Sequence, residues 1–276
     1  MTDTEQVIAE FVANTEQRFD LANLDSFWDC EAIFRSLLDG DFAQNVVNAQ
    51  LRHLASDSNY MGDWPESQII LHRGPGYALS LALLRSSRTY IHTTSFLAMY
   101  APVSGSALSY DRYRFPSTYE NAAFDPGITL EKDDSGSVES RELLKLYSHR
   151  YAYDFKIEQP LLVLKFTTAA FHVLEWLFHK DSLRPWQAND STLLSTRLRV
   201  AAHLLGRLAH PSSVEALEFL ASHPNPTVRW AGIQNLARVS PSEAIIRLNR
   251  AVDDPHPHVR RAAVKSLMQR QKKAVE

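Results

Sequence analysis

The sequence predicts an α+β chain of more than one domain: helices first, then a β-rich barrel or sandwich, then a stack of helical repeats. Three observations support this fold class. Apolar residues recur at helical spacing through roughly the first 58 positions. Short apolar runs rich in aromatic and β-branched residues follow, broken by turn residues. A segment near the C-terminus recurs 31 residues later. We therefore expect helices at 1–60, a barrel at 61–185 and repeats at 190–276.

The N-terminal region predicts three apolar helix faces. Ile8, Phe11 and Val12 belong to the first face, residues 27–38 carry the second and residues 42–54 carry the third. These segments have the pattern of packing helices rather than of an active site.

The middle of the chain predicts many short strands, a pattern typical of a sandwich or small barrel. The expected strands are 68–72, 77–84, 89–100, 107–115, 128–131, 143–148, 151–157 and 161–168. Turns are expected at 74–76 and 133–136, where Gly, Pro and Asp gather. Residues 167–179 fit a helix or a strand, and we favour a last strand of the barrel.

The C-terminal third contains a repeated helical unit. Val228 and Arg229 follow a polar, proline-containing turn, and the same pair recurs as Val259 and Arg260 with matching apolar positions behind it. A weaker copy starts at Ser195. Because one helix pair cannot bury its own apolar face, such units stack on each other. This pattern resembles the HEAT and HEAT-like repeats, and the resemblance implies that each of these arginines bonds to a turn of a neighbouring repeat.

A second resemblance lies in the β-rich part. Residues 88–115, RTYIHTTSFLAMYAPVSGSALSYDRYRF, resemble the first motif of cupins, especially the branch that contains thiol dioxygenases. The resemblance implies a double-stranded β-helix over about residues 60–180, preceded by helices. His92 matches the first metal ligand of that motif, whereas Thr94 stands where the second histidine is expected. His149 is the candidate for a later ligand, and His72 could supply another donor.

The cupin resemblance implies a non-haem metal-dependent oxygenase. Its metal, Fe(II), would be held by His72, His92 and His149, in a pocket lined by Tyr110, Tyr113 and Tyr151. The repeats would dock a protein partner or a substrate carrier. Thr94 leaves an alternative open, in which the barrel has lost its metal and the chain is a non-catalytic ligand-binding or protein-interaction scaffold. In that alternative each histidine lines the barrel or its edge and bonds to a neighbour.

The charge distribution is uneven. Residues 196–276 contain 13 Lys and Arg against 6 Asp and Glu, a net +7 within a chain whose net charge is -3. A basic repeat region makes nucleic acid a possible partner, although no aromatic platform or continuous basic stripe accompanies it. Arg270, Lys272 and Lys273 are the basic residues expected at an interaction surface, with a solvated helix end as the alternative reading.

Other classes of site lack their motifs. Residues 74–76 have no following Lys-Ser/Thr of a phosphate-binding loop, and no Gly-x-Ser-x-Gly elbow occurs. Cys30 is the single cysteine, so no internal disulfide can form. The N-terminal residues have no signal-peptide pattern, and Lys165, His172 and Glu175 interrupt the most apolar stretch, residues 161–178. We therefore expect a cytoplasmic protein that does not cross a membrane.

Overall fold

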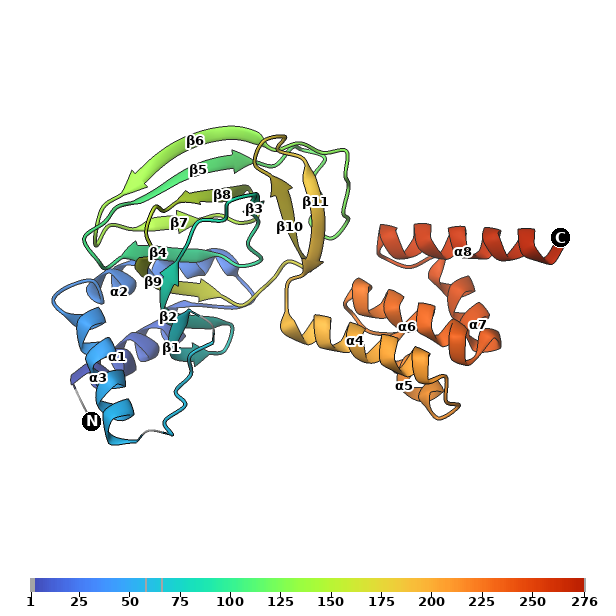
Figure 1. Ribbon diagram of the computed structural model, residues 1–276, viewed down its shortest axis with the longest axis horizontal. Coiled ribbons are helices and arrows are strands. Elements are labelled where there is room, and N and C mark those ends of the chain that lie inside the picture. Colours follow the sequence, from blue (N-terminus) through green and yellow to red (C-terminus); the bar gives the residue numbers. More distant parts are fainter. Residues whose placement is uncertain (1–2, 58, 66, 276) are drawn as a thin grey trace. The chain divides into compact units, whose positions relative to one another are not determined.

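The computed structural model describes residues 3–57, 59–65 and 67–275, with side chains described from residue 4 to residue 271 apart from positions 58 and 66. The chain divides into two compact units (Figure 1). The first unit comprises residues 1–119 and 125–187, and the second comprises residues 120–124 and 188–276. A short piece of the β-rich part of the sequence thus belongs to the second unit.

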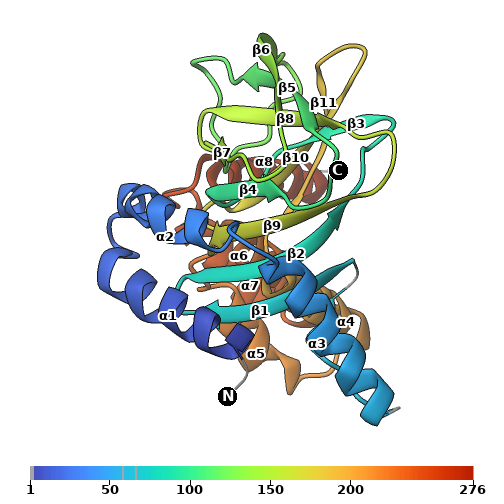
Figure 2. The ribbon, with the colours of Figure 1, turned by 90° about the vertical axis from the view of Figure 1, so that its left-hand side faces the viewer.

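Helices cover one face of the largest sheet of the first unit (Figure 2). They are α1 (Asp3–Arg18), the 3₁₀-helix η1 (Leu24–Cys30), α2 (Glu31–Ser36) and α3 (Phe42–Ser56). Three buried phenylalanines, one each from α1, η1 and α2, surround Phe166 of the sheet, with ring centroids 5.1, 4.6 and 5.9 Å from it. The predicted packing role of the N-terminal helices is confirmed. Burial of these apolar faces is the main force that holds the helices on the sheet.

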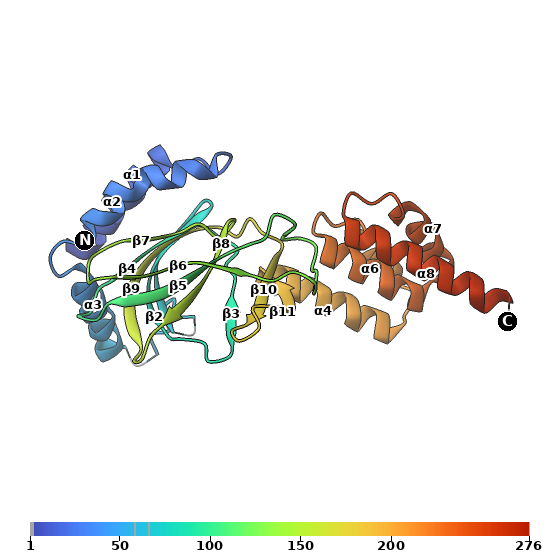
Figure 3. The same cartoon turned by 90° about the horizontal axis from the view of Figure 1, so that it is seen from above.

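Eleven strands follow among the described residues, and every strand pair whose register is defined is antiparallel. The five-stranded sheet has the order β1-β2-β9-β4-β7, and two three-stranded sheets have the orders β6-β5-β8 and β11-β10-β3. Seen from above, β5, β6 and β8 overlie β4, β7 and β9 (Figure 3). The strand bounds are β1 (Gln68–Gly74), β2 (Tyr77–Leu84), β3 (Tyr90–His92), β4 (Ala98–Pro102), β5 (Leu108–Arg114), β6 (Glu131–Val138), β7 (Leu144–Leu146), β8 (Tyr151–Lys156), β9 (Leu161–Thr168), β10 (Leu174–His179) and β11 (Pro185–Asp190).

The strand predictions need four corrections. The strand expected at 128–131 is absent, because residues 128–130 form no strand and β6 begins at Glu131. Residues 89–100 are not one strand, because β3 pairs with β10 whereas β4 pairs with β9 and β7 in another sheet. The turn expected at 133–136 lies inside β6, whose polar side chains bond to β5: Asp133 binds Arg112 at 2.7 Å. The strand β11 has no counterpart in the prediction. Within 167–179, the preference for a strand is confirmed by β10, although residues 169–173 form no strand.

An apolar core fills the space between the five-stranded sheet and β5 and β8. Its fully or largely buried members share the inward face of their strands: Ala98, Tyr100, Leu108, Leu144, Leu146, Tyr153, Leu161 and Val163. The opposite face of the five-stranded sheet packs on the N-terminal helices. Because side chains alternate along a strand, each residue of the sheet is assigned to one core or the other. The first unit is thus layered: helices, a large sheet, an inner core and a smaller sheet.

The second unit is an array of helices, as the repeat period predicts. Its helices are α4 (Leu193–Leu208), α5 (Ser213–Leu220), α6 (Pro226–Val239), α7 (Pro241–Ala251) and α8 (Pro257–Val275). Asn225 caps α6 by accepting from the amide of Thr227 at 2.9 Å, and Pro226 occupies the first turn. Two apolar clusters join α4, α5 and α6 to one another and then α6 to α7 and α8. Helix α6 is therefore the centre of the array.

Among the described residues, no helix combines the length and the apolar character that crossing a membrane requires.

Candidate functional site

A pocket of about 310 Å³, which we name the His92 pocket, lies beside β3. The strand β3 ends at His92, and the chain then crosses to the other sheet through residues 93–97, so Thr94 lies at the crossing. The buried Thr93 fixes this crossing, because its hydroxyl accepts from the amide of Trp176 at 2.8 Å. The pocket is lined by Arg85, Ser86, Ser87, Tyr90, His92, Thr94, Leu146, Tyr153, Asp154 and Phe155. Leu146 and Tyr153 also belong to the inner core, so the pocket borders the barrel interior.

Two polar groups of the His92 pocket have no protein partner. The hydroxyl oxygen of Thr94 is buried and has no hydrogen bond within the described part of the chain. Arg85 is exposed and forms no hydrogen bond or ion pair with any described residue. A buried hydroxyl without a partner is costly, and a ligand oxygen would relieve that cost. The pocket therefore offers a cation and a hydrogen-bonding group to a polar ligand.

Burial, together with one nearby charge, keeps the imidazole of His92 neutral near pH 7. Burial lowers the pKa of His92 below its ordinary value, and the nearby Lys180 ammonium lowers it further. Lys180 is held by the carboxylate of Asp154 at 2.6 Å. Directly across the sheet from Asp154 lies Asp111, which is also buried. Lysines bind both carboxylates, so the repulsion between these two facing aspartates is offset.

A lysine lies on the inward face of the five-stranded sheet. Lys165 on β9 lies directly opposite Tyr100 of β4 and so shares its inward face. Its ammonium nitrogen is 5.3 Å from the centroid of the Tyr100 ring and 6.0 Å from that of Phe96. These distances are in the range of a cation–π interaction. Phe155, a wall of the His92 pocket, stacks on Tyr100 at 5.9 Å, which links Lys165 to the pocket through two rings.

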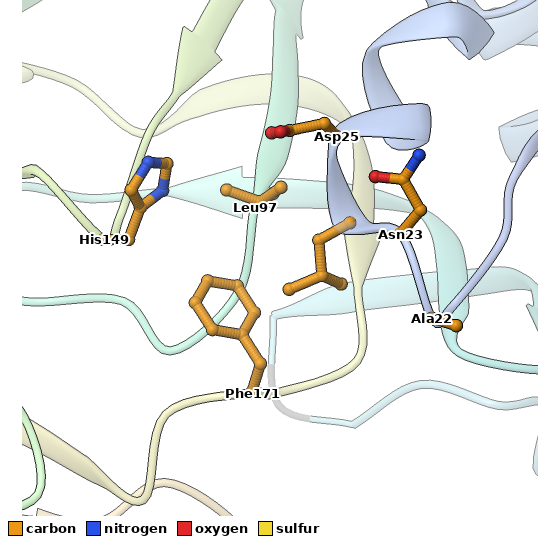
Figure 4. A pocket seen from close by; sticks show the side chains of 7 residues that line it. Ala22, Asn23, Asp25, Leu97, His149 and Phe171 are labelled. Atoms are coloured by element: carbon orange, nitrogen blue, oxygen red, sulfur yellow. The ribbon is translucent and has the colours of Figure 1, made fainter.

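His149 lines a different pocket, of about 340 Å³ (Figure 4). The labelled side chains in Figure 4 include Asp25 from η1, Leu97, Phe171 and His149, which come from separate segments of the first unit. Burial lowers the pKa of His149, Arg150 lowers it further, and Asp25 acts in the opposite direction. His149 also borders a third pocket together with Arg114, Tyr119 and Tyr151.

Two ionisable groups next to these pockets were missed by the sequence prediction of site residues. Burial, and then the proximity of His149, lower the pKa of His172 to about 4. Burial raises the pKa of Glu175, whose carboxylate accepts a hydrogen bond from the hydroxyl of the buried Ser95 at 2.8 Å. Both residues interrupt the apolar stretch at 161–178, and that interruption is the signal that could have found them.

The structure does not bring the three predicted metal ligands together. His92 and His149 line separate pockets. His72 lies opposite Leu79 on the helix-covered face of the sheet, with its ring 5.7 Å from that of Tyr77. In the described part of the chain, no group of three or more His, Cys, Asp or Glu side chains is placed to hold a metal ion.

The chemistry of the inward-facing residues also does not fit an Fe(II) centre. Such a centre needs about three imidazole or carboxylate donors converging on one point. The interior positions instead carry apolar side chains and the Lys165 ammonium, which would repel a metal cation in a medium of low dielectric constant. The described residues thus offer no donor set that fits an Fe(II) ion.

The predicted pocket and surface residues lie in several places. Tyr151 lines the third pocket, whereas Tyr110 packs in the inner core, 5.9 Å from the ring of Tyr153. Tyr113 is buried, and its pKa is raised by burial and by the nearby Asp111. Arg270 is exposed on α8. Lys272 and Lys273 lie on the same helix, but their side chains fall outside the described residues.

Comparisons with solved structures give distant likenesses to part of the chain. Hydroquinone 1,2-dioxygenase from Sphingomonas sp. TTNP3, solved with 4-hydroxybenzoate bound, is 14% identical over 41% of this chain and 70% of that chain, with a TM-score of 0.30. A cupin superfamily protein from Desulfitobacterium hafniense is 12% identical over 37% of this chain and 75% of that chain, with a TM-score of 0.24. A search of curated proteins yields no match.

The C-terminal part has a match at the level of sequence. Residues 195–268 match the family model described as HEAT repeats. The expected bond to a neighbouring turn is present for Arg229, which binds Asp254 in the turn before α8 through two contacts of 2.7 Å. Arg260 instead bonds to the carbonyl oxygens of Asp254 and Pro255 in the turn before its own helix. This part of the chain is a HEAT-like repeat array.

Proposed function

We propose that this chain is a non-catalytic binding module, in which the barrel holds a small organic anion in the His92 pocket and the repeats dock a protein partner. The observation that carries the proposal is the pairing of an unpartnered cation, Arg85, with the buried, unpartnered hydroxyl of Thr94 in one pocket. A carboxylate or phosphate would accept from both groups.

The electrostatics of the interior favour an anion over a cation. Arg85 at the pocket and Lys165 on the inward face form no ion pair with any described carboxylate. A bound anion would compensate these charges, and His92 would contribute a further positive charge on protonation. The enclosed volume of about 310 Å³ suits a ligand of metabolite size. The proposal therefore takes the scaffold alternative for the barrel in place of an oxygenase.

The repeats support the docking half of the proposal. Stacked helix pairs present extended surfaces that other proteins bind. The net +7 of residues 196–276 favours acidic protein partners through electrostatic complementarity. Nucleic acid would be bound through phosphate contacts with a steep salt dependence, which distinguishes it from a protein partner.

Isothermal titration calorimetry with phosphate, succinate and benzoate tests the pocket. We expect saturable binding of at least one of these anions with one site per chain. Arg85→Ala removes the cation and Thr94→Val removes the hydroxyl at nearly constant volume, so each variant is expected to weaken binding about tenfold or more. Arg88→Ala, which removes an exposed arginine three residues away, is the matched control. Equal affinities for the Arg85 and Arg88 variants would refute the proposed site.

Iron loading tests the rival function. Under the proposal, protein treated with chelator and then with Fe(II) under anaerobic conditions retains no stoichiometric iron after gel filtration. Retention of about one iron per chain, abolished by His92→Ala, would favour the oxygenase instead.

A further inference from the structure

The arginine of the central repeat bonds to two turns at once. Arg229 donates to the carbonyl oxygens of His223 and Pro224 in the turn before its own helix, at 2.6 and 3.0 Å. Its two remaining donor positions reach Asp254 in the next turn, each at 2.7 Å. Both side chains of this ion pair are largely buried, at 13% and 7% exposure. The guanidinium therefore fastens one repeat to the next.

The arginine of the last repeat makes only the first half of these bonds. Arg260 donates through Nη1 to the carbonyl oxygens of Asp254 and Pro255, at 2.7 and 2.9 Å, in the same manner as Arg229 in its own turn. Its other donors meet no carboxylate within the described part of the chain. The guanidinium is thus held in place without the carboxylate contact that Arg229 makes to the next turn.

The apolar face beside Arg260 is also uncovered. Ile233 of α6 is 3% exposed, because the following repeat packs over it. The equivalent residue of α8, 31 positions later, is Val264, which is 36% exposed. One turn further, Met268 is 58% exposed. Apolar side chains are therefore left exposed beside Arg260.

We propose that the surface formed by Arg260, Val264 and Met268, named the α8 surface, docks a helical hairpin of another protein whose turn carries an Asp or Glu. The carboxylate would bind Arg260 as Asp254 binds Arg229, and apolar residues of the hairpin would cover Val264 and Met268. Exposed Arg261 and Lys265 surround the surface with positive charge, which favours an acidic partner. This inference rests on the docking role proposed for the repeats and specifies its partner.

A second copy of this chain is a poorer occupant. If such a copy presented Asp254, the carboxylate equivalent to the proposed contact, it would use a group that Arg229 already binds through two contacts. Using it between copies would break a buried ion pair within each chain, and breaking such a pair is costly.

A hairpin copied from this chain tests the surface directly. In the extended protein, residues 271–276 are replaced by a second copy of residues 240–271, which supplies two helices and their acidic turn in the register of the repeat. We expect the thermal unfolding midpoint of the repeats to rise by about 5 °C, since added stacking stabilises an array. Arg260→Gln, or Asn in place of the aspartate of the added turn, is expected to remove at least half of that rise. Arg261→Gln is the matched control.

Two results would overturn the inference. One is an added hairpin that leaves the thermal unfolding midpoint unchanged, or whose rise in midpoint is reduced equally by Arg260→Gln and by Arg261→Gln. The other is a natural chain that sediments as a dimer and becomes a monomer with Arg260→Gln, because the occupant would then be a second copy. Neither result bears on the anion titration, so failure here is distinguishable from failure of the proposed pocket.

Discussion

The half-buried side chain of His172 is expected to contribute to the pH dependence of the first unit's stability. His172 has a pKa of about 4 in the folded chain against an ordinary value of 6.5, with burial as the main cause. Between these two values the unfolded chain binds a proton that the folded chain does not bind. Stability attributable to this residue is therefore lost as pH falls from 6.5 toward 4.

Replacement of His172 tests this dependence. The unfolding free energy of the unchanged protein is expected to fall between pH 7 and pH 5. In His172→Gln this fall is expected to be smaller by about 2 kcal/mol. Urea denaturation followed by tryptophan fluorescence is a suitable measurement, because Trp28, Trp64, Trp176 and Trp186 lie in the first unit. His53→Gln, at an exposed histidine of α3, is the control. Parallel pH profiles for the two variants would contradict the assignment.

His92 links ligand affinity to pH. Its pKa is lowered by burial and by Lys180, so the imidazole is neutral at pH 7.5 and gains its proton as the pH falls. An anion beside it favours the charged form, and binding therefore tightens on acidification. We expect about fivefold tighter binding at pH 5.5 than at pH 7.5, which corresponds to about 1 kcal/mol for a partly exposed ion contact. In His92→Gln, calorimetry is expected to show this gain abolished, and its persistence would place the titrating group elsewhere.

The residue types that matter could be predicted only in part. His92 was predicted as a metal ligand and Thr94 was noted as the residue in place of a second ligand, and both line the His92 pocket. Three other residues were not identified from the sequence: Arg85, Glu175 and His172. Their neighbours in the structure are residues far away in the sequence, which a local pattern does not reveal. His72 does not lie beside His92. A register shift in β1 between Ile70 and His72 places His72 opposite Leu79, on the helix-covered face of the sheet.

Secondary-structure elements differ in how well local patterns predict them. The N-terminal helices and the repeats follow from apolar spacing, because an amphipathic helix carries its burial pattern in its own sequence. Strand ends do not, since they depend on which neighbour a strand pairs with. Residues 93–97 interrupt an apolar run because the chain changes sheets there, and β6 is a strand despite its polar sequence because Asp133 and Ser135 bond to β5.

Close helix packing in the repeats depends on one glycine. A Cβ added at Gly232 of α6 would lie 2.4 Å from the amide nitrogen of Ala221 and 2.7 Å from the carbonyl carbon of Leu220. These are backbone atoms, so helices α5 and α6 would have to separate. We expect Gly232→Ala to lower the unfolding free energy of the repeats by roughly 2–3 kcal/mol.

Thermal unfolding monitored by circular dichroism checks this expectation. Gly105→Ala is a suitable comparison, because an added Cβ at Gly105 meets nothing within 4 Å. Similar midpoints for the two variants would mean that α5 and α6 are not packed as closely as described.

At the scale of the whole molecule, two units of different architecture share one chain. The charge asymmetry and the change of pattern near residue 190 predict such a division, and the structure groups residues 188–276 with residues 120–124 in one compact unit. The assignment of residues 120–124 to that same unit was not predictable, because no local pattern in this polar loop indicates it. Each unit has its own apolar core, so the anion-binding and docking roles are separable by mutation.

Anion binding by metal-free protein tests the central claim most directly. The same preparation is titrated calorimetrically with phosphate, succinate and benzoate after chelator treatment and again after incubation with Fe(II). We predict one anion per chain with the same affinity in both states, because Arg85 and Thr94 supply the contacts. Binding that appears only after iron loading would contradict the account, as would the absence of binding by all three anions.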